Sequence, residues 1–222
     1  MIQFEHVTKR YPERGDALSD ITFEMDAGDM AFLTGHSGAG KSTVLKLIGL
    51  LERPTRGRVS INHRDLATLS RRRIPYHRRD VGMIFQDHRL LADRSVFENV
   101  ALPLTVLGLT HKEIGRRVRA ALDQVGLLSK ERLCPIALSG GEQQRIGIAR
   151  AVVGRPPVLL ADEPTGNLDP ELSREIMTLF ERFHQVGVTL LIATHDIGLI
   201  TSMPYRTLTL SDGRLAADSG SW

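Results

Sequence analysis

The sequence predicts an α/β fold in which crossover helices cover a parallel sheet. Three observations favour it: short apolar strand-like runs alternate with helical stretches, a glycine-rich turn joins one such run to a helix, and two runs near the amino terminus alternate like half-buried strands. A helical stretch at residues 95–133 interrupts this alternation. We therefore expect a single domain, residues 1–222, with an antiparallel β subdomain and an inserted α-helical subdomain at approximately residues 95–135.

In chain order, the strands are expected at residues 4–11, 21–25, 30–34, 59–61, 81–85, 158–161, 188–193 and 207–210. The helical subdomain shows one clear amphipathic helix, which begins where Thr110 and Glu113 have the spacing of a capping box. Apolar residues from Ile114 to Val125 then recur on one face of that helix. The last strands, separated by helical stretches, are typical of a parallel sheet with crossover helices.

Composition excludes several classes of protein. A chain of 222 residues that is 41% hydrophobic and 25% charged is an ordinary globular one, and a net charge of +3 is too small to argue for nucleic acid as a partner. The longest nearly apolar stretch, residues 100–109, is about half of what a membrane-spanning helix needs, so we expect the protein to stay in the cytosol. The single Cys134 is expected to fill a small apolar gap.

Five arginines between Arg71 and Arg79 form a solvated face or a surface for acidic partner residues or anionic lipid headgroups.

Residues 35–42 read Gly-His-Ser-Gly-Ala-Gly-Lys-Ser and match the phosphate-binding pattern G-x-x-x-x-G-K-[ST] in full. The glycines let the backbone take positive φ angles and turn successive N–H groups toward an anion. Lys41 adds a positive charge for the β- and γ-phosphates, and the hydroxyl of Ser42 suits Mg²⁺. The helix that follows directs its positive end at the same phosphates. The pattern predicts a nucleoside triphosphate site with contacts from Gly35, His36, Ser37, Gly38, Ala39, Gly40, Lys41, Ser42 and Thr43.

A second pattern, Leu-Ser-Gly-Gly-Glu at residues 138–142, precedes a helix expected to run to Val153. Ser139 and Glu142 have capping-box spacing, which alone indicates an ordinary helix start. That spacing does not explain Gly140 and Gly141, because a glycine costs about 1 kcal/mol relative to alanine in a helix. Bare backbone at a helix start lets a phosphate sit on its positive end. We therefore expect Ser139, Gly140 and Gly141 to bind nucleotide.

A third pattern is an apolar run at residues 158–161 that ends in Asp162 and Glu163. Two adjacent carboxylates at the end of a buried strand are costly to desolvate unless a cation or water chemistry needs them. In nucleotide hydrolases the aspartate supports Mg²⁺, which predicts Asp162 as a metal ligand beside Ser42. Glu163 would then face a water in line with the γ-phosphate and polarise it or take its proton. The alternative is a pair of carboxylates in a polar loop.

With these motifs, the chain resembles the ATP-binding-cassette (ABC) ATPases over its whole length. It also carries Gln86 after a strand, Gly-Asn-Leu-Asp at residues 166–169 after the carboxylate pair, and Thr-His-Asp at residues 194–196 after another strand. The resemblance implies an ABC-type nucleotide-binding domain of the P-loop NTPase class, which hydrolyses ATP with Mg²⁺.

The same resemblance assigns roles to four further residues. It implies that Gln86 contacts Mg²⁺ and the attacking water, that His195 contacts the γ-phosphate, and that Asp169 helps to join two subunits. Tyr11 resembles the aromatic residue on which adenine stacks. Each has a structural alternative: Gln86 as a surface loop residue, Tyr11 as a packing aromatic, Asp169 as the N-cap of a helix, and His195 as a structural residue.

The family also implies a homodimer that holds ATP between the phosphate loop of one subunit and Ser139, Gly140 and Gly141 of the other. Closure follows ATP binding, and reopening follows hydrolysis. Glu142 departs from the family, which most often has glutamine there. We interpret Glu142 as the capping partner of Ser139, pointing away from phosphate, because a carboxylate facing the γ-phosphate would weaken closure.

A cassette of this size cannot transport anything by itself, so the resemblance implies a transmembrane partner and a peripheral position at the cytoplasmic face of the membrane. Residues 85–91 and 98–104 resemble the branch of the family whose membrane partners transmit force across the bilayer, and within it the members that act in bacterial cell division. There, ATP-driven closure controls cell-wall hydrolases. Two alternatives stay open: a lipoprotein-releasing or macrolide-exporting system, and an ABC ATPase without a membrane partner, in DNA repair or translation.

Overall fold

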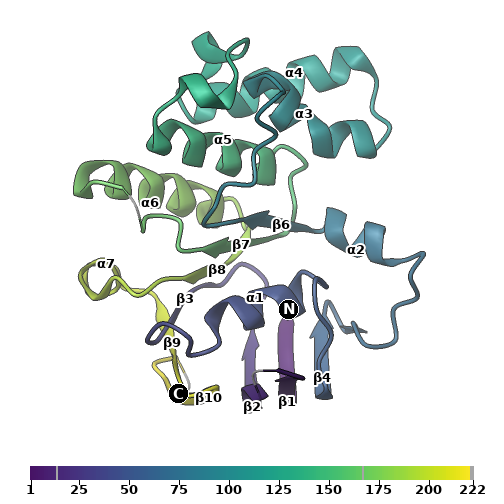
Figure 1. The fold of residues 1–222 in the computed structure, drawn as a ribbon, viewed down its shortest axis with the longest axis vertical. Helices are drawn as coiled ribbons and strands as arrows, with labels where there is room; N and C mark the ends of the chain where they lie inside the picture. The colour runs from purple at the N-terminus through teal and green to yellow at the C-terminus, as the bar shows by residue number, and fades with distance from the viewer. Residues whose placement is uncertain (14, 167, 221–222) are drawn as a thin grey trace.

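Two β-sheets and a layer of helices make up the fold in this computed structural model (Figure 1), which describes residues 1–13, 15–166 and 168–220. The smaller sheet is antiparallel and has the strand order β2-β1-β4-β5. Its members are β1 (Ile2–Tyr11), β2 (Gly15–Met25), β4 (Arg56–Ile61) and β5 (Arg64–Asp65). This sheet is the antiparallel β subdomain that the amino-terminal alternation predicted, with Ile2, Phe4 and Val7 buried on its inner face.

The larger sheet has the strand order β10-β9-β3-β8-β7-β6. Its first five strands in chain order are β3 (Met30–Thr34), β6 (Val81–Ile84), β7 (Val158–Asp162), β8 (Thr189–Ala193) and β9 (Arg206–Ser211). They pair in parallel, as expected. The sequence interpretation missed β10 (Arg214–Asp218), which pairs antiparallel to β9 across the turn at Asp212 and Gly213.

The large sheet is buried on both faces, which explains why its strands read as continuous apolar runs. Along β3, Ala31 and Leu33 belong to the core shared with the small sheet, whereas Phe32 belongs to the core on the helical side. Because β3, β7 and β8 are parallel neighbours, their carboxyl ends meet at one edge of the sheet. The glycine-rich turn, the carboxylate pair and the histidine motif all follow those strand ends.

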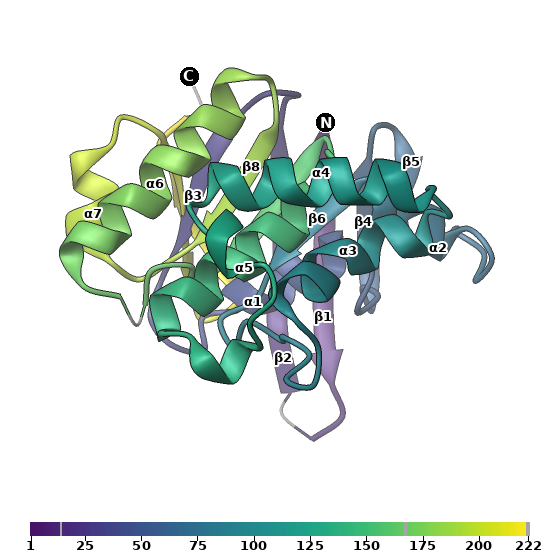
Figure 2. The same ribbon diagram turned by 90° about the horizontal axis from the view of Figure 1, so that it is seen from above.

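Helices cover the two faces unequally. Helix α1 (Lys41–Ile48) contributes Val44, Leu45 and Ile48 to the core shared with the small sheet. Seen from above (Figure 2), four helices lie over the other face: α3 (Val96–Val106), α4 (His111–Gln124), α5 (Gly140–Val152) and α6 (Pro170–Gln185). Two short 3₁₀ turns, η1 (Leu128–Lys130) and η2 (Pro135–Ala137), join α4 to α5. None of the described helices combines the length and apolar character that crossing a bilayer requires.

Three details differ from expectation. Thr110 does cap α4 by accepting from the Glu113 N–H, but Glu113 turns its carboxylate to Arg117 at 2.6 Å instead of closing a capping box. Cys134 is exposed and fills no apolar gap, because it lies at the surface turn before η2. A true capping box that we did not predict, Ser95 with Glu98, starts α3.

The arginine cluster contains a short helix, α2 (Ile74–Arg79). This helix is tied to the end of α1: Nε2 of the buried His77 lies 2.7 Å from the Ile48 carbonyl, and Arg78 donates to the Leu50 carbonyl at 2.9 Å. Burial lowers the pKa of His77. The cluster is therefore partly structural, while Arg71, at its amino-terminal end, is exposed. One last helix, α7 (Ile197–Ser202), follows the histidine motif.

Candidate active site

The glycine-rich turn connects β3 to α1 and has the backbone that the pattern requires. Gly35, Gly38 and Gly40 have φ angles of 142°, 85° and 108°. At Gly35, a Cβ atom would lie 2.2 Å from the Leu210 carbonyl oxygen, so a side chain cannot be accommodated there. The loop is therefore a close-packed turn at the amino-terminal end of α1, where free N–H groups favour an anion.

Lys41 and Ser42 begin α1 and point toward the edge of the large sheet. The buried ammonium of Lys41 donates to the Gly35 carbonyl at 2.7 Å and the His36 carbonyl at 3.3 Å. It also lies 3.7 Å from Oε1 of Glu163. The Ser42 hydroxyl donates to Oδ1 of Asp162 at 3.1 Å, which joins the phosphate loop to the carboxylate pair across 120 residues of sequence.

The carboxylate pair ends β7, and its two members face different surroundings. Burial raises the pKa of the Asp162 carboxyl, the hydrogen bond from Ser42 opposes this, and the neighbouring charge of Glu163 adds to it. Glu163 has a left-handed φ of 47° and a side chain that is 10% exposed. Its Oε2 lies 2.9 Å from Nδ1 of His195 but makes no hydrogen bond among the described residues. A buried carboxylate oxygen with free acceptor capacity can hold a water.

One cavity of about 760 Å³ gathers most of the predicted residues. Tyr11 comes from the end of β1, Gln86 from the loop after β6, and His195 from the loop after β8. They line the cavity together with His36, Ser37, Gly38, Gly40, Lys41, Ser42, Thr43 and Glu163. Gly35, Ala39 and Asp162 are not part of the lining, and Ala39 is fully buried.

Two lining residues, Asp16 and Ala17, escaped the sequence interpretation. Asp16 pairs with Arg10 at 2.6 Å, and that pair lowers the pKa of the Asp16 carboxyl. Both residues belong to β2 and reach the cavity only because β2 pairs with β1 beside Tyr11. A strand position of this kind carries no motif that could have indicated it.

The residues present fit Mg²⁺. The hydroxyl of Ser42, the carboxylate of Asp162 and the amide of Gln86 offer oxygen donors, and Mg²⁺ in nucleotide sites takes few protein ligands because phosphates and waters complete its shell. The hydroxyl of Ser42 and Oδ1 of Asp162 already lie 3.1 Å apart, close enough for one ion to contact both. The described residues hold no cluster of three or more His, Cys, Asp or Glu that could bind a metal ion.

The Ser-Gly-Gly tip lies elsewhere, at the start of α5. Ser139 and Glu142 form the predicted capping box, with both reciprocal bonds in place. Glu142 also pairs with Lys130, and that pair, with the bond from the Ser139 backbone, lowers its pKa. The carboxylate of Glu142 is therefore occupied within its own subunit, as expected.

The two glycines of the tip differ. Gly141 is buried, and a Cβ there would lie 2.1 Å from Cδ2 of Leu172 in α6, so packing within the chain already favours glycine. Around Gly140 no atom lies within 4 Å of the Cβ position. The described part of the chain gives no reason for glycine at 140. None of Ser139, Gly140 or Gly141 lines the cavity that holds Lys41.

Asp169 caps α6. Its Oδ1 accepts from the N–H groups of Glu171 and Leu172, both at 3.0 Å, and the bond from Leu172 is the main cause of its lowered pKa. The structural alternative for this residue is thus realised, while its predicted contact with a second subunit stays a prediction. The preceding motif residue Asn167 lies outside the described residues.

Comparison with known families gives a consistent result. A family model described as "ABC transporter" matches residues 18–166. A second model, described as "AAA domain, putative AbiEii toxin, Type IV TA system", matches residues 132–201. The first match covers the phosphate loop, the Ser-Gly-Gly tip and the carboxylate pair.

Among curated proteins, the chain is 60% identical over 220 residues to the cell division ATP-binding protein FtsE of Escherichia coli (strain K12), an alignment that covers 99% of each chain. It is 45% identical to the protein of the same name from Bacillus subtilis (strain 168), over 98% of this chain and 96% of that one.

Among solved structures, it is similar to the dimeric structure of MJ0796, a bacterial ABC transporter cassette, with a TM-score of 0.92, 35% identity and coverage of 99% and 98%. A post-hydrolysis dimer of MJ0796 bound to ADP and Pi gives a TM-score of 0.91 at 34% identity.

Proposed function

Because this chain belongs to the ABC transporter family, we propose that it is the ATP-hydrolysing subunit of a membrane complex that acts in bacterial cell division. The ATPase activity follows from the family. The division role is supported by full-length relatives named for that process, at 60% identity in one species and 45% in another.

Nucleotide binding is assigned to the cavity beside α1. The N–H groups of the phosphate loop and the ammonium of Lys41 bind the phosphates, and Tyr11, which lines the same cavity, stacks on adenine. Lys41 exchanges its present carbonyl contacts for phosphate oxygens, which charge-assisted hydrogen bonds favour. Mg²⁺, held by Ser42, Asp162 and Gln86, would neutralise charge on the phosphates.

Hydrolysis is assigned to Glu163. Glu163 lines the same cavity as Lys41, and its Oε2 makes no hydrogen bond among the described residues, which suits a general base that orients a water and takes its proton. Lys41 and His195 lie within 4 Å of the two carboxylate oxygens and hold the side chain in place. We assign His195 to the γ-phosphate, and Gln86, which lines the same cavity, to the water.

Two copies of the chain complete the site. The place of Gly140 at the positive end of α5, outside the cavity of its own subunit, supports a role as a phosphate contact for a second copy. Asp169 would lie beside this contact at the start of α6. The similar structures of MJ0796 are dimers, which agrees with this proposal.

A transmembrane subunit is the proposed partner, in the manner of FtsX, and it would hold this chain at the cytoplasmic face of the membrane. A groove of about 430 Å³ between α2 and α3 offers a docking surface. Its floor includes Val81 and Met83, and Val106 on its wall is 62% exposed. Arg78 and Arg79 flank it, so an amphipathic partner segment with acidic residues fits.

In this proposal, ATP-driven closure of the dimer moves the partner and so controls cell-wall hydrolases on the other side of the membrane. The observation that carries it is the 60% identity to the Escherichia coli FtsE protein over 99% of both chains. A tagged copy purified from detergent extracts should bring down one transmembrane protein, and depletion of this chain should give undivided filaments. Recovery of a lipoprotein-releasing or macrolide-exporting subunit, or of no membrane protein, would contradict the division role.

A further inference from the structure

The loop that carries Gln86 contains two consecutive residues with left-handed backbone. After β6 the chain passes through His88 and Arg89, whose φ angles are 54° and 47°. Non-glycine residues rarely adopt this left-handed region, and two in succession cost free energy that other contacts must offset. Within the loop, the His88 N–H donates to the Phe85 carbonyl at 3.1 Å and the Arg89 N–H to the Asp87 carbonyl at 2.5 Å. The Arg89 guanidinium also donates to Oδ1 of Asp87 at 3.3 Å and lies over the Phe85 ring. None of these bonds engages the carbonyls of His88 and Arg89.

Arg150, near the end of α5, supplies the missing contacts. Its Nη2 donates to the His88 carbonyl at 2.5 Å and its Nη1 to the Arg89 carbonyl at 2.6 Å. One planar guanidinium therefore holds the carbonyls of both left-handed residues, a geometry that a lysine ammonium cannot reproduce. Burial lowers the pKa of Arg150, and the nearby charge of Asp87 opposes that effect.

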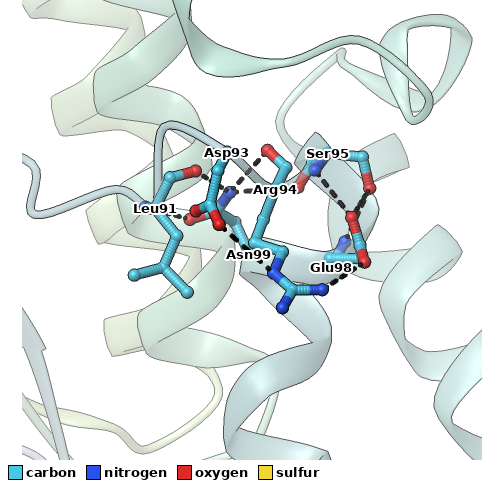
Figure 3. Close-up of polar contacts among 6 residues, drawn as sticks. All are labelled: Leu91, Asp93, Arg94, Ser95, Glu98 and Asn99. Carbon is cyan, nitrogen blue, oxygen red and sulfur yellow. Dashed lines mark hydrogen bonds and ion pairs between the residues drawn. The ribbon is translucent and has the colours of Figure 1, made fainter.

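The far end of the loop is fixed independently (Figure 3). Asn99 of α3 is fully buried, and its side chain bonds both the N–H and the carbonyl of Leu91, as well as the carbonyls of Arg94 and Ser95. The capping box of Ser95 and Glu98 closes the same turn. Between the end of β6 and this anchor, Arg150 of α5 contacts the loop at His88 and Arg89, its two left-handed residues.

We propose that Arg150 is a positioning residue for hydrolysis: by fixing the backbone at His88 and Arg89, it holds Gln86 toward the cavity that contains Ser42 and Glu163. Arg150 also lines the groove assigned to the membrane partner. One side chain thus touches both the partner's docking surface and the loop that enters the active site. This inference rests on the proposed function, because it gives the docking groove a direct contact with the hydrolytic machinery.

The test is a double-mutant cycle on the full chain with Arg150→Lys, Gln86→Ala and both together, measured as kcat for ATP hydrolysis. Arg150→Lys should lower kcat about tenfold, as for other residues that orient a contact to metal or water. The double variant should be no slower than Gln86→Ala alone, because Arg150 acts through Gln86. Affinity for a fluorescent ATP analogue without Mg²⁺ should stay within about twofold of wild type.

Arg53→Lys is the matched control. Arg53 also binds backbone carbonyls, those of Leu66, Ala67 and Leu69, but in a loop that does not line the cavity. Its kcat should be that of wild type. Should Arg150→Lys fail to fold by circular dichroism, Arg150→Gln, which keeps amide donors near the carbonyls, replaces it in the cycle.

An unchanged kcat in the Arg150 variant, or effects of Arg150→Lys and Gln86→Ala that multiply in the double variant, would overturn the role of Arg150. Those outcomes leave the proposed function intact, since wild-type hydrolysis is measured in the same series. Absence of hydrolysis by the wild-type chain would contradict the proposed function itself.

Discussion

Gly40 and Gly140 both stand at the start of a helix, but their surroundings differ. At Gly40 the φ is 108°, and a Cβ would lie 2.6 Å from Cδ2 of Leu18 and 2.8 Å from the Ala17 carbonyl. At Gly140 no atom lies within 4 Å of the Cβ position. Contacts within the chain and a positive φ therefore require glycine at position 40, whereas no contact among the described residues requires glycine at position 140. The geometry of the phosphate loop is thus fixed by contacts within the chain, whereas the proposed role of Gly140 depends on a contact with a second copy of the chain.

Lys41→Ala should have the largest effect, and it tests the phosphate loop. Loss of the buried ammonium removes charge-assisted bonds worth about 3 kcal/mol, so ATP affinity should fall about 10²-fold or more. Titration with a fluorescent ATP analogue measures this, with the exposed Lys112→Ala as control. Retention of micromolar affinity would refute the role of the phosphate loop.

Glu163→Gln should separate binding from hydrolysis. Loss of a positioned base should slow phosphate release about 10²-fold or more while ATP still binds. Because the closed state is then not consumed, ATP should drive this variant into dimers in sedimentation velocity runs. Normal turnover would show that another residue orients the water, and a variant that stays monomeric with ATP would count against the sandwich.

Gly140→Asp tests the proposed contact between the start of α5 and a second copy of the chain. A carboxylate at the first turn of α5 is favourable for the helix, so the thermal stability of the monomer should be unchanged or higher. Against phosphate, the same charge is repelled by about 4 kcal/mol at 4 Å, which should weaken ATP-driven dimerisation about 10²-fold or more. Gly140→Ala, which adds one methyl group, is the milder comparison. Dimerisation equal to wild type in the Asp variant would break the contrast between Gly40 and Gly140.

Ser139→Ala and Ser95→Ala form a matched pair, because each serine caps a helix through the same box. Both should lower the free energy of unfolding by about 1 kcal/mol in urea. Ser139→Ala alone should also weaken ATP-driven dimerisation, by about tenfold, since one phosphate contact is lost. Equal dimerisation in the two variants would show that Ser139 acts as a helix cap and does not contact phosphate.

Glu142→Gln should have the smallest effect. Pairing with Lys130 lowers the folded pKa of Glu142, so its contribution is present above the unfolded pKa and is lost as pH falls through the folded value. The variant should be less stable at pH 7 by under about 1 kcal/mol, and this difference should shrink at pH 3. Dimerisation with ATP should be unchanged. A difference in stability that persists at pH 3 would indicate a cause other than charge.

The parts of the site that were predictable from sequence are those written in consecutive residues. The phosphate loop, the Ser139 capping box and the carboxylate pair each occupy a few adjacent positions, and local backbone rules fix their form. The bond from Ser42 to Asp162 could be expected only because parallel strands bring their carboxyl ends to one edge of the sheet.

Other features were less accessible for different reasons. The hairpin of β9 and β10 was missed although Asp212-Gly213 is a strong turn signal and lies between the apolar residues Leu210 and Leu215 of the two strands. The contact of Arg150 with His88 spans 62 residues and involves only a backbone carbonyl, which leaves no trace in residue type. Gly141 was assigned to phosphate alone because its packing against Leu172 of another helix depends on tertiary structure.

The contacts of Lys41 within the phosphate loop have a consequence for the release of product. The ammonium of Lys41 is already satisfied by two carbonyls of its own turn. In the proposed function, an incoming triphosphate would replace these carbonyls as partners of Lys41, so the net gain in binding free energy would be smaller than the gross attraction. When product departs, the same two carbonyls would accept from the ammonium again. The carbonyls of the phosphate loop thus stabilise the Lys41 ammonium when no phosphate is bound. Such an arrangement favours repeated binding and release of nucleotide over very tight binding.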